Sequence, residues 1–141
     1  MVLYRNEIAS TFDAVHDTVG EIMEQLKLVD IINKTYLLFR INFMLREVLN
    51  NAVEHGNKFH EEKMIFIEIV LDGNLLITKV KDEGEGIVLN SSHESNMDYI
   101  LRERTRGITL VKQYQFQLKS ENTELCITLD LDSVVEEVSH D

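Results

Sequence analysis

The stretch from residue 41 to residue 57 constrains the fold most, because it predicts one long helix with two different faces. Glu47, Asn51 and His55 follow one another at intervals of four, so on a helix they form a single polar column. We expect Gly56 to end this helix in the left-handed cap conformation. The apolar residues recur at helical spacing on one face: Ile41, Met44, Leu45, Val48, Leu49 and Ala52.

The polar column has two interpretations. A carboxylate at Glu47 can accept a proton or orient a hydroxyl group, and a carboxamide one turn later can offer a neutral oxygen to a hard cation. An ordinary solvated face of an amphipathic helix has the same pattern, and it is the more frequent reason for such a column. The segment from Val80 to Ile87, further along the chain, favours the first interpretation.

Length and composition indicate one soluble globular domain. Of the 141 residues, 44% are hydrophobic and 28% are charged, and we expect a single domain over residues 1–141 with an acidic tail from about Asp132. The formal net charge of −11 argues against nucleic acid or an anionic membrane as the main partner. The single Cys126 excludes an internal disulfide, and no Cys/His spacing indicates zinc. Without a signal pattern or a long apolar run, the sequence predicts a cytoplasmic protein.

Helices are predicted from hydrophobic periodicity and capping residues. The first should begin after Ser10 or Thr11 and continue to about Lys27. The second should cover residues 34–55, with Asp30 or Asn33 as its cap. A polar loop over residues 88–103 and a short helix over residues 107–114 are expected further on.

Strands alternate in polarity and gather mainly after the first two helices. An Asp72-Gly73 pair predicts a hairpin turn between two of them. The predicted strands cover residues 3–8 (an edge strand), 64–71, 75–81, 115–120 and 124–131. The first strand of the hairpin is apolar on both sides for much of its length. This pattern predicts an α+β sandwich in which a mixed or antiparallel sheet carries helices on one face.

Asp82 continues the mostly apolar face of the predicted strand over residues 75–81, which is unusual for an acid unless it has a partner there. A carboxylate at the end of a strand can accept a hydrogen bond from an exocyclic amine such as the 6-amino group of adenine. Gly84 and Gly86 would let the backbone lie flat against a ring and adopt positive φ. By itself this pattern is weak, and it also fits a plain turn.

A third motif lies where Gly107 is predicted to begin a helix. The free N–H groups of a helix N-terminus, together with Arg104, Thr105 and Arg106, would form an anion site. A solvated run of charge is the alternative. The chain has only six glycines, and four of them fall at these three motifs: Gly56, Gly84, Gly86 and Gly107.

The order of these motifs resembles that of the GHKL, or Bergerat-fold, ATP-binding superfamily, in which an N box precedes a G1 box and a G2 box. The chain is most similar to the small anti-sigma-factor serine kinases of bacterial partner-switching systems, over about residues 5–131. The most specific parts are Glu47-x-x-x-Asn51-Ala52-x-x-His55-Gly56 and Asp82-x-Gly84-x-Gly86. The resemblance implies a Bergerat-fold two-layer α+β sandwich with a mixed, mostly antiparallel sheet and helices on one face.

The resemblance also implies roles for particular residues. Asn51 would ligate a Mg²⁺ ion that bridges the phosphates of ATP, and Glu47 would be the base that orients or deprotonates the attacking hydroxyl. Asp82 would read adenine. Residues 88–106 would form a lid over the nucleotide. The remaining residues implied to bind ATP are His55, Gly84, Gly86, Thr105, Arg106 and Gly107.

Partners follow from the same resemblance. The acceptor would be a serine on a STAS-type anti-sigma antagonist, the same surface could hold a sigma factor, and a homodimer would form through the first strand and helix. Thr105 stands where the family usually has a further glycine, which puts the grip on phosphate in question. The chain could therefore be a non-catalytic binding module. A histidine kinase ATP-binding domain is a third interpretation, disfavoured because no phosphoacceptor helix precedes it.

Overall fold

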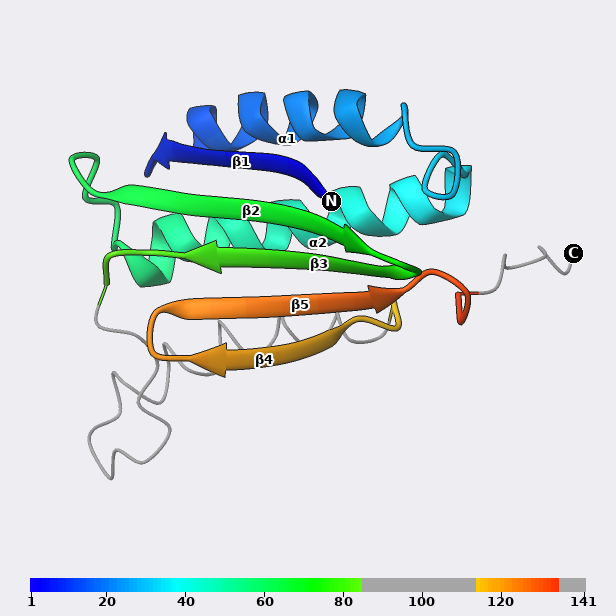
Figure 1. The fold of residues 1–141 in the computed structure, drawn as a ribbon. Coiled ribbons are helices and arrows are strands. Elements are labelled where there is room, and N and C mark those ends of the chain that lie inside the picture. Colours follow the sequence, from blue (N-terminus) through cyan, green and yellow to red (C-terminus); the bar gives the residue numbers. More distant parts are fainter. Residues whose placement is uncertain (85–113, 135–141) are drawn as a thin grey trace, which may run out of the picture.

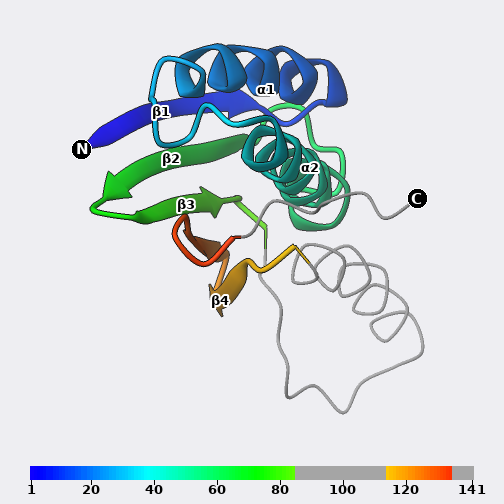
Figure 2. The ribbon, with the colours of Figure 1, turned by 90° about the vertical axis from the view of Figure 1, so that its right-hand side faces the viewer.

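The computed structural model describes residues 1–84 and 114–134, which form a two-layer α+β sandwich (Figure 1). The elements are β1 (Val2–Ala9), α1 (Phe12–Leu26), α2 (Thr35–Asn51), the π-helical turn η1 (Ala52–Gly56), β2 (Met64–Asp72), β3 (Leu75–Lys81), β4 (Gln117–Glu121) and β5 (Glu124–Asp130). Figure 2 shows both α-helices on the same side of the sheet. The predicted α+β sandwich is confirmed.

The five strands lie in the order β1-β2-β3-β5-β4, and all four pairings are antiparallel. The sheet of the described residues is therefore antiparallel rather than mixed. β1 is an edge strand, as predicted. The predicted hairpin joins β2 to β3, and Gly73 takes a φ of 59° in its turn. β5 lies next to β3, so the β4–β5 hairpin extends the sheet on the side opposite to β1.

The core lies between the sheet and the two helices. The inward side chains of β2 are fully buried: Ile65, Ile67 and Ile69. From the helices, the core takes among others Val19, Ile22, Leu26, Ile41, Leu45 and Leu49. The inward side chains of β2 and the apolar face of α2 therefore lie on opposite sides of one apolar layer.

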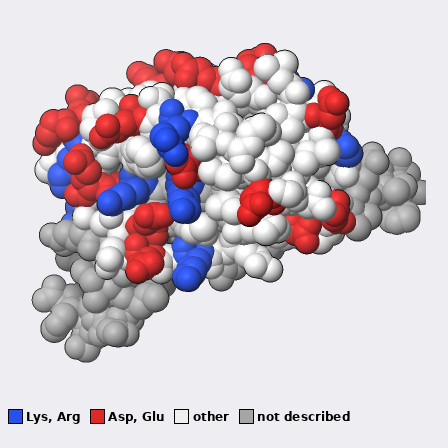
Figure 3. Space-filling view, in the orientation of Figure 1, with Lys and Arg blue, Asp and Glu red and all other residues white. Residues whose placement is uncertain are grey.

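The other face of the sheet is open, although the sequence of β2 is apolar on both sides. Phe66 is 40% exposed there, and Glu68 pairs with Arg5 of β1 through a hydrogen bond of 2.7 Å. Figure 3 shows this face, with Lys, Arg, Asp and Glu side chains mixed on its left half. No helix within the described ranges 1–84 and 114–134 has the length and apolar run of a membrane span.

The helix ends agree with the sequence at one end and differ at others. Thr11 caps α1, since its hydroxyl accepts a hydrogen bond of 3.1 Å from the backbone N–H of Ala14. The prediction of Asp30 or Asn33 as the cap of α2 is wrong, because Lys34 occupies the N-cap position and makes no side-chain capping bond.

The left-handed cap predicted at Gly56 is also wrong. α2 ends at Asn51, and η1 continues the chain as a π-helical turn to Gly56. Among the described residues, Gly73 is the only glycine with positive φ, and the left-handed positions after η1 are Lys58 and Phe59. The chain therefore reverses two residues later than the glycine pattern predicted.

Candidate functional site

The ends of α2 and β3 meet at a small pocket, with a cavity volume of about 30 Å³. Its lining comes from α2 with η1, from β3 with the residue after it, and from the β4–β5 hairpin: Val48, Asn51, Ala52, Val80, Asp82, Ser120, Asn122, Thr123, Glu124 and Leu125. Asn51 and Asp82, which the sequence placed in two separate motifs, therefore share one pocket.

Asp82 reaches this pocket because it continues the inward face of β3. Leu76, Thr78 and Val80 precede it on that face with 1%, 1% and 3% exposure, and Asp82 itself is 5% exposed. Its Oδ1 atom accepts a hydrogen bond of 2.9 Å from the backbone N–H of Gly84. A buried carboxylate, held in this way at the edge of the core, is a hydrogen-bond acceptor directed by the backbone rather than a solvated charge.

Two glycines make this arrangement sterically possible. A Cβ atom on Gly84 would lie 2.0 Å from the carbonyl oxygen of Gly56 and 3.0 Å from Oδ1 of Asp82. Neither Gly56 nor Gly84 has positive φ. The positive φ that the sequence predicted for these two glycines is wrong. Glycine is required here because neighbouring atoms approach too closely to leave room for a Cβ atom.

The third wall of the pocket was missed by the sequence analysis. The backbone N–H of Asp82 donates a hydrogen bond of 3.2 Å to the carbonyl oxygen of Thr123, in the turn before β5. Asn122 precedes it with a φ of 55°, a conformation that glycine and asparagine adopt most readily. The alternating pattern of β5 was visible in the sequence, but its pairing with β3 was not, so nothing placed Thr123 beside Asp82.

Glu47 lies one turn before Asn51 on α2 and is half-buried. It lines a different, mainly apolar cavity along α1 and α2, whose described lining is Met23, Lys27, Thr35, Leu38, Phe39, Asn42, Phe43, Arg46 and Glu47. Within the part of the chain that the structure describes, Glu47 is thus near the pocket of Asn51 but not part of its lining.

His55 lies in η1, and its side chain is only 12% exposed, with Nε2 at 3.9 Å from Oε2 of Glu54. The regular column of Glu47, Asn51 and His55 ends at Asn51, because a π-helical turn has a wider hydrogen-bonding period than an α-helix. The other expected site residues, Gly86, Thr105, Arg106 and Gly107, lie outside the described residues, as do the lid and residues 107–113 of the predicted third helix.

These observations define an α+β domain with a partly polar pocket between a helix end and a strand end. Residues 11–131 match the family of histidine kinase-like ATPase domains, and the chain belongs to this family. It is therefore a member of the GHKL superfamily, as the order of its motifs predicted.

A comparison with curated protein sequences gave no match. Among solved structures, the chain is similar to the histidine kinase domain of a blue-light activated histidine kinase from Erythrobacter litoralis EL346, with 17% identity and a TM-score of 0.48. The matched region covers 84% of this chain and 61% of that structure. The histidine kinase AdeS of Acinetobacter baumannii is also similar, with 17% identity and a TM-score of 0.40. That match covers 91% of this chain and 66% of the AdeS structure. The chain thus spans less than two thirds of either structure.

Proposed function

We propose that this chain binds ATP with Mg²⁺ and transfers the terminal phosphoryl group to a serine of a STAS-type partner protein. The observation that carries the proposal is the meeting of Asn51 and Asp82 in one pocket, from two motifs that are separate in the sequence. Both residues come with apolar neighbours from α2 with η1 and from the strands, so polar and apolar side chains line the same pocket.

The residues of the pocket fit an adenine nucleotide. The carboxylate of Asp82 would accept a hydrogen bond from the 6-amino group of adenine, and the apolar side chains of Ala52, Val80 and Leu125 would contact the ring. The close approach of Gly56 and Gly84 fits the same role, because any Cβ there would push the carboxylate out of place. This arrangement supports ATP rather than a ligand without an exocyclic amine.

Asn51 fits the role of the Mg²⁺ ligand. Its carboxamide offers one neutral oxygen, which suits an ion that takes most of its other ligands from phosphates and water. The cation would neutralise phosphate charge, which matters in a chain of net charge −11. Glu47, one turn earlier, would act as the base toward the serine hydroxyl, while Thr105, Arg106 and Gly107 would hold the phosphates.

Calorimetry of ATP binding, with and without Mg²⁺, tests the first part of this proposal. We expect binding in both conditions and tighter binding with the metal. Incubation with γ-labelled ATP and a STAS protein tests the second part, and an acid-stable label on a serine of the partner is the expected result. Absence of any ATP binding would contradict the proposal, and an acid-labile label on histidine would favour a histidine kinase instead.

A non-catalytic binding module is the second candidate, and the position of Glu47 favours it. In the described residues, Glu47 lines the cavity along α1 and α2 rather than the pocket of Asn51 and Asp82. Such a module would hold a STAS protein or a sigma factor and keep the nucleotide as a structural ligand. ATP binding without any labelled serine would support the module over the kinase.

A homodimer through β1 and α1 stays a prediction of the same proposal. Light scattering on the purified chain measures it directly. A monomeric mass at micromolar concentration would remove the dimer and leave the proposed nucleotide site unaffected.

A further inference from the structure

Asn57, the residue that follows η1, has the lowest exposure of the buried polar residues in the described part of the chain, at 0%. Its side chain joins two other segments. Nδ2 donates a hydrogen bond of 3.0 Å to the carbonyl oxygen of Met64, and Oδ1 accepts one of 2.8 Å from the backbone N–H of Glu83. A buried carboxamide satisfied at both ends fixes the segments it joins, because breaking either bond would leave a buried polar group unpaired.

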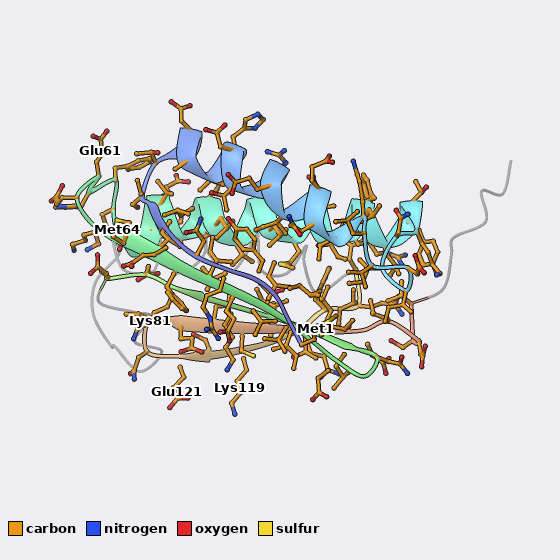
Figure 4. All side chains as sticks on the ribbon, turned by 45° about the horizontal axis from the view of Figure 1, so that its top comes forward. Met1, Glu61, Met64, Lys81, Lys119 and Glu121 are labelled. Atoms are coloured by element: carbon orange, nitrogen blue, oxygen red, sulfur yellow. The ribbon has the colours of Figure 1, made fainter. Side chains whose placement is uncertain are left out.

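A third hydrogen bond closes these contacts into a ring. The carboxylate of Glu83 accepts a bond of 2.6 Å from the backbone N–H of Met64, so Asn57, Met64 and Glu83 each contact the other two. The ring holds together the end of η1, the start of β2 and the residues after β3. Figure 4 shows Met64 and Lys81 at the same end of the sheet, where these segments meet.

The ring lies directly beside the pocket. Gly56 precedes Asn57 in the chain, and Asp82 precedes Glu83. Two members of the ring therefore directly follow the two residues, Gly56 and Asp82, that approach each other closely at the pocket. The bond from the Glu83 N–H to Asn57 therefore restrains the backbone directly after Asp82. The position of the Asp82 carboxylate is therefore set by Asn57 as well as by the alternation of β3.

We propose that Asn57 is a positioning residue that sets the selectivity of the pocket for adenine over guanine nucleotides. The inference rests on the proposed ATP site. Adenine presents an amine where guanine presents a carbonyl oxygen, so a fixed carboxylate accepts a hydrogen bond from the first and repels the second. If the carboxylate moves freely, most of the difference in affinity between adenine and guanine nucleotides is lost, because a hydrogen bond depends on distance and angle.

The test compares ATP and GTP affinity in the wild type, Asn57→Ala and Glu83→Ala. Calorimetry is run at a temperature at which circular dichroism shows each variant folded. For Asn57→Ala we expect ATP affinity to fall about tenfold and GTP affinity to change little, so that the ratio of the two falls about tenfold. Glu83→Ala opens the same ring at an exposed position, and it should lower the ratio by about threefold.

Thr18→Ala is the matched control, because it truncates another buried polar side chain, in α1 and outside the lining of the pocket. It should lower the melting temperature and leave the ATP-to-GTP ratio unchanged. If Asn57→Ala also lowers stability but keeps the wild-type ratio, its role is structural only and the inference is overturned. If Asn57→Ala does not fold, Glu83→Ala is the deciding variant: a wild-type ratio of ATP to GTP affinity in Glu83→Ala would overturn the inference.

Nucleotide binding by the wild-type protein distinguishes a failure of this inference from a failure of the proposed function. Wild-type protein that binds ATP, with variants that keep its selectivity, would overturn the role of Asn57 and leave the ATP site standing. Wild-type protein that binds neither nucleotide would overturn both.

Discussion

A Cβ atom on Gly56 would lie 2.1 Å from the Oδ2 atom of Asp82, a separation that real side chains essentially never adopt. The end of η1 and the residue that follows β3 are therefore in contact only because residue 56 is a glycine. The same contact brings Asn51, one turn before Gly56, into the pocket that Asp82 lines. The geometry of the site thus depends on the absence of a Cβ atom at residue 56.

Replacing Gly56 with alanine should damage both stability and nucleotide binding. The added methyl group must displace the buried carboxylate of Asp82, which should destabilise the protein by about 1–3 kcal/mol. We expect ATP affinity to fall by about tenfold or more, because the displaced carboxylate no longer reaches the base. Urea denaturation and calorimetry measure the two effects.

Gly20→Ala is the control for this substitution. Gly20 lies within α1, and an added Cβ would meet no atom within 4 Å, so helix propensity should stabilise the protein by about 0.5–1 kcal/mol. Unchanged ATP affinity in Gly56→Ala would show that the contact with Asp82 is irrelevant to binding.

Asp82→Asn tests the adenine role of the carboxylate without removing its shape. The amide oxygen can still accept the bond from the Gly84 N–H, so stability should change by less than about 1 kcal/mol. ATP affinity should fall about tenfold, since the charge and half of the acceptor capacity are lost. Asp72→Asn, at the exposed end of β2, should change neither quantity. Equal ATP affinity in Asp82→Asn and wild type would remove Asp82 from the adenine role.

Glu47→Ala separates binding from transfer. Because Glu47 does not line the pocket of Asn51 and Asp82 in the described residues, ATP affinity should stay within about twofold of wild type. Phosphorylation of a STAS partner should fall by about 10²–10⁴-fold, the usual effect of losing a general base. Glu54→Ala, on the exposed side of η1, should keep both activities. Transfer at the native rate in Glu47→Ala would exclude Glu47 as the base.

The cap of α1 gives a prediction about stability alone. Thr11→Ala removes the acceptor for the Ala14 N–H and should lower the free energy of unfolding by about 1 kcal/mol. Thr11→Ser keeps that acceptor and should recover most of the loss. Nucleotide affinity should be the same in all three proteins, because the cap lies outside the lining of the pocket. A loss of ATP binding in Thr11→Ala would show coupling between α1 and the site.

Tyr4 gives a prediction about alkaline pH. Burial raises the pKa of Tyr4 above its usual value of 10.0, and the hydrogen bond to Glu21 acts in the same direction, while that from Asn6 opposes them. A raised pKa in the folded state stabilises the fold below pH 10, and this contribution is lost as the pH rises further. Wild-type stability should therefore fall more steeply above pH 10 than that of Tyr4→Phe. Parallel curves in urea denaturation would contradict this.

Much of the fold could be predicted from the sequence because helical and strand periods are local properties. The alternation of residues 64–71 and the helical spacing of residues 12–26 appear in the structure as β2 and α1 with shifts of one or two residues at most. The same local regularity predicted that Asp82 would continue the inward face of β3, and the structure confirms its burial. The helix ends were less predictable, since the π-helical turn after Asn51 has no period of its own in the sequence.

The sequence by itself determined the elements, the motifs and the family, because spacing along the chain specifies which residues share a face. Only the tertiary structure decided which faces meet. It placed β5 next to β3, so that Thr123 reached Asp82, and it buried Asn57 against Glu83, the second residue after β3. The physical reason is that these contacts join residues far apart in the chain, and their distances follow from the packing of the whole sandwich rather than from any local pattern.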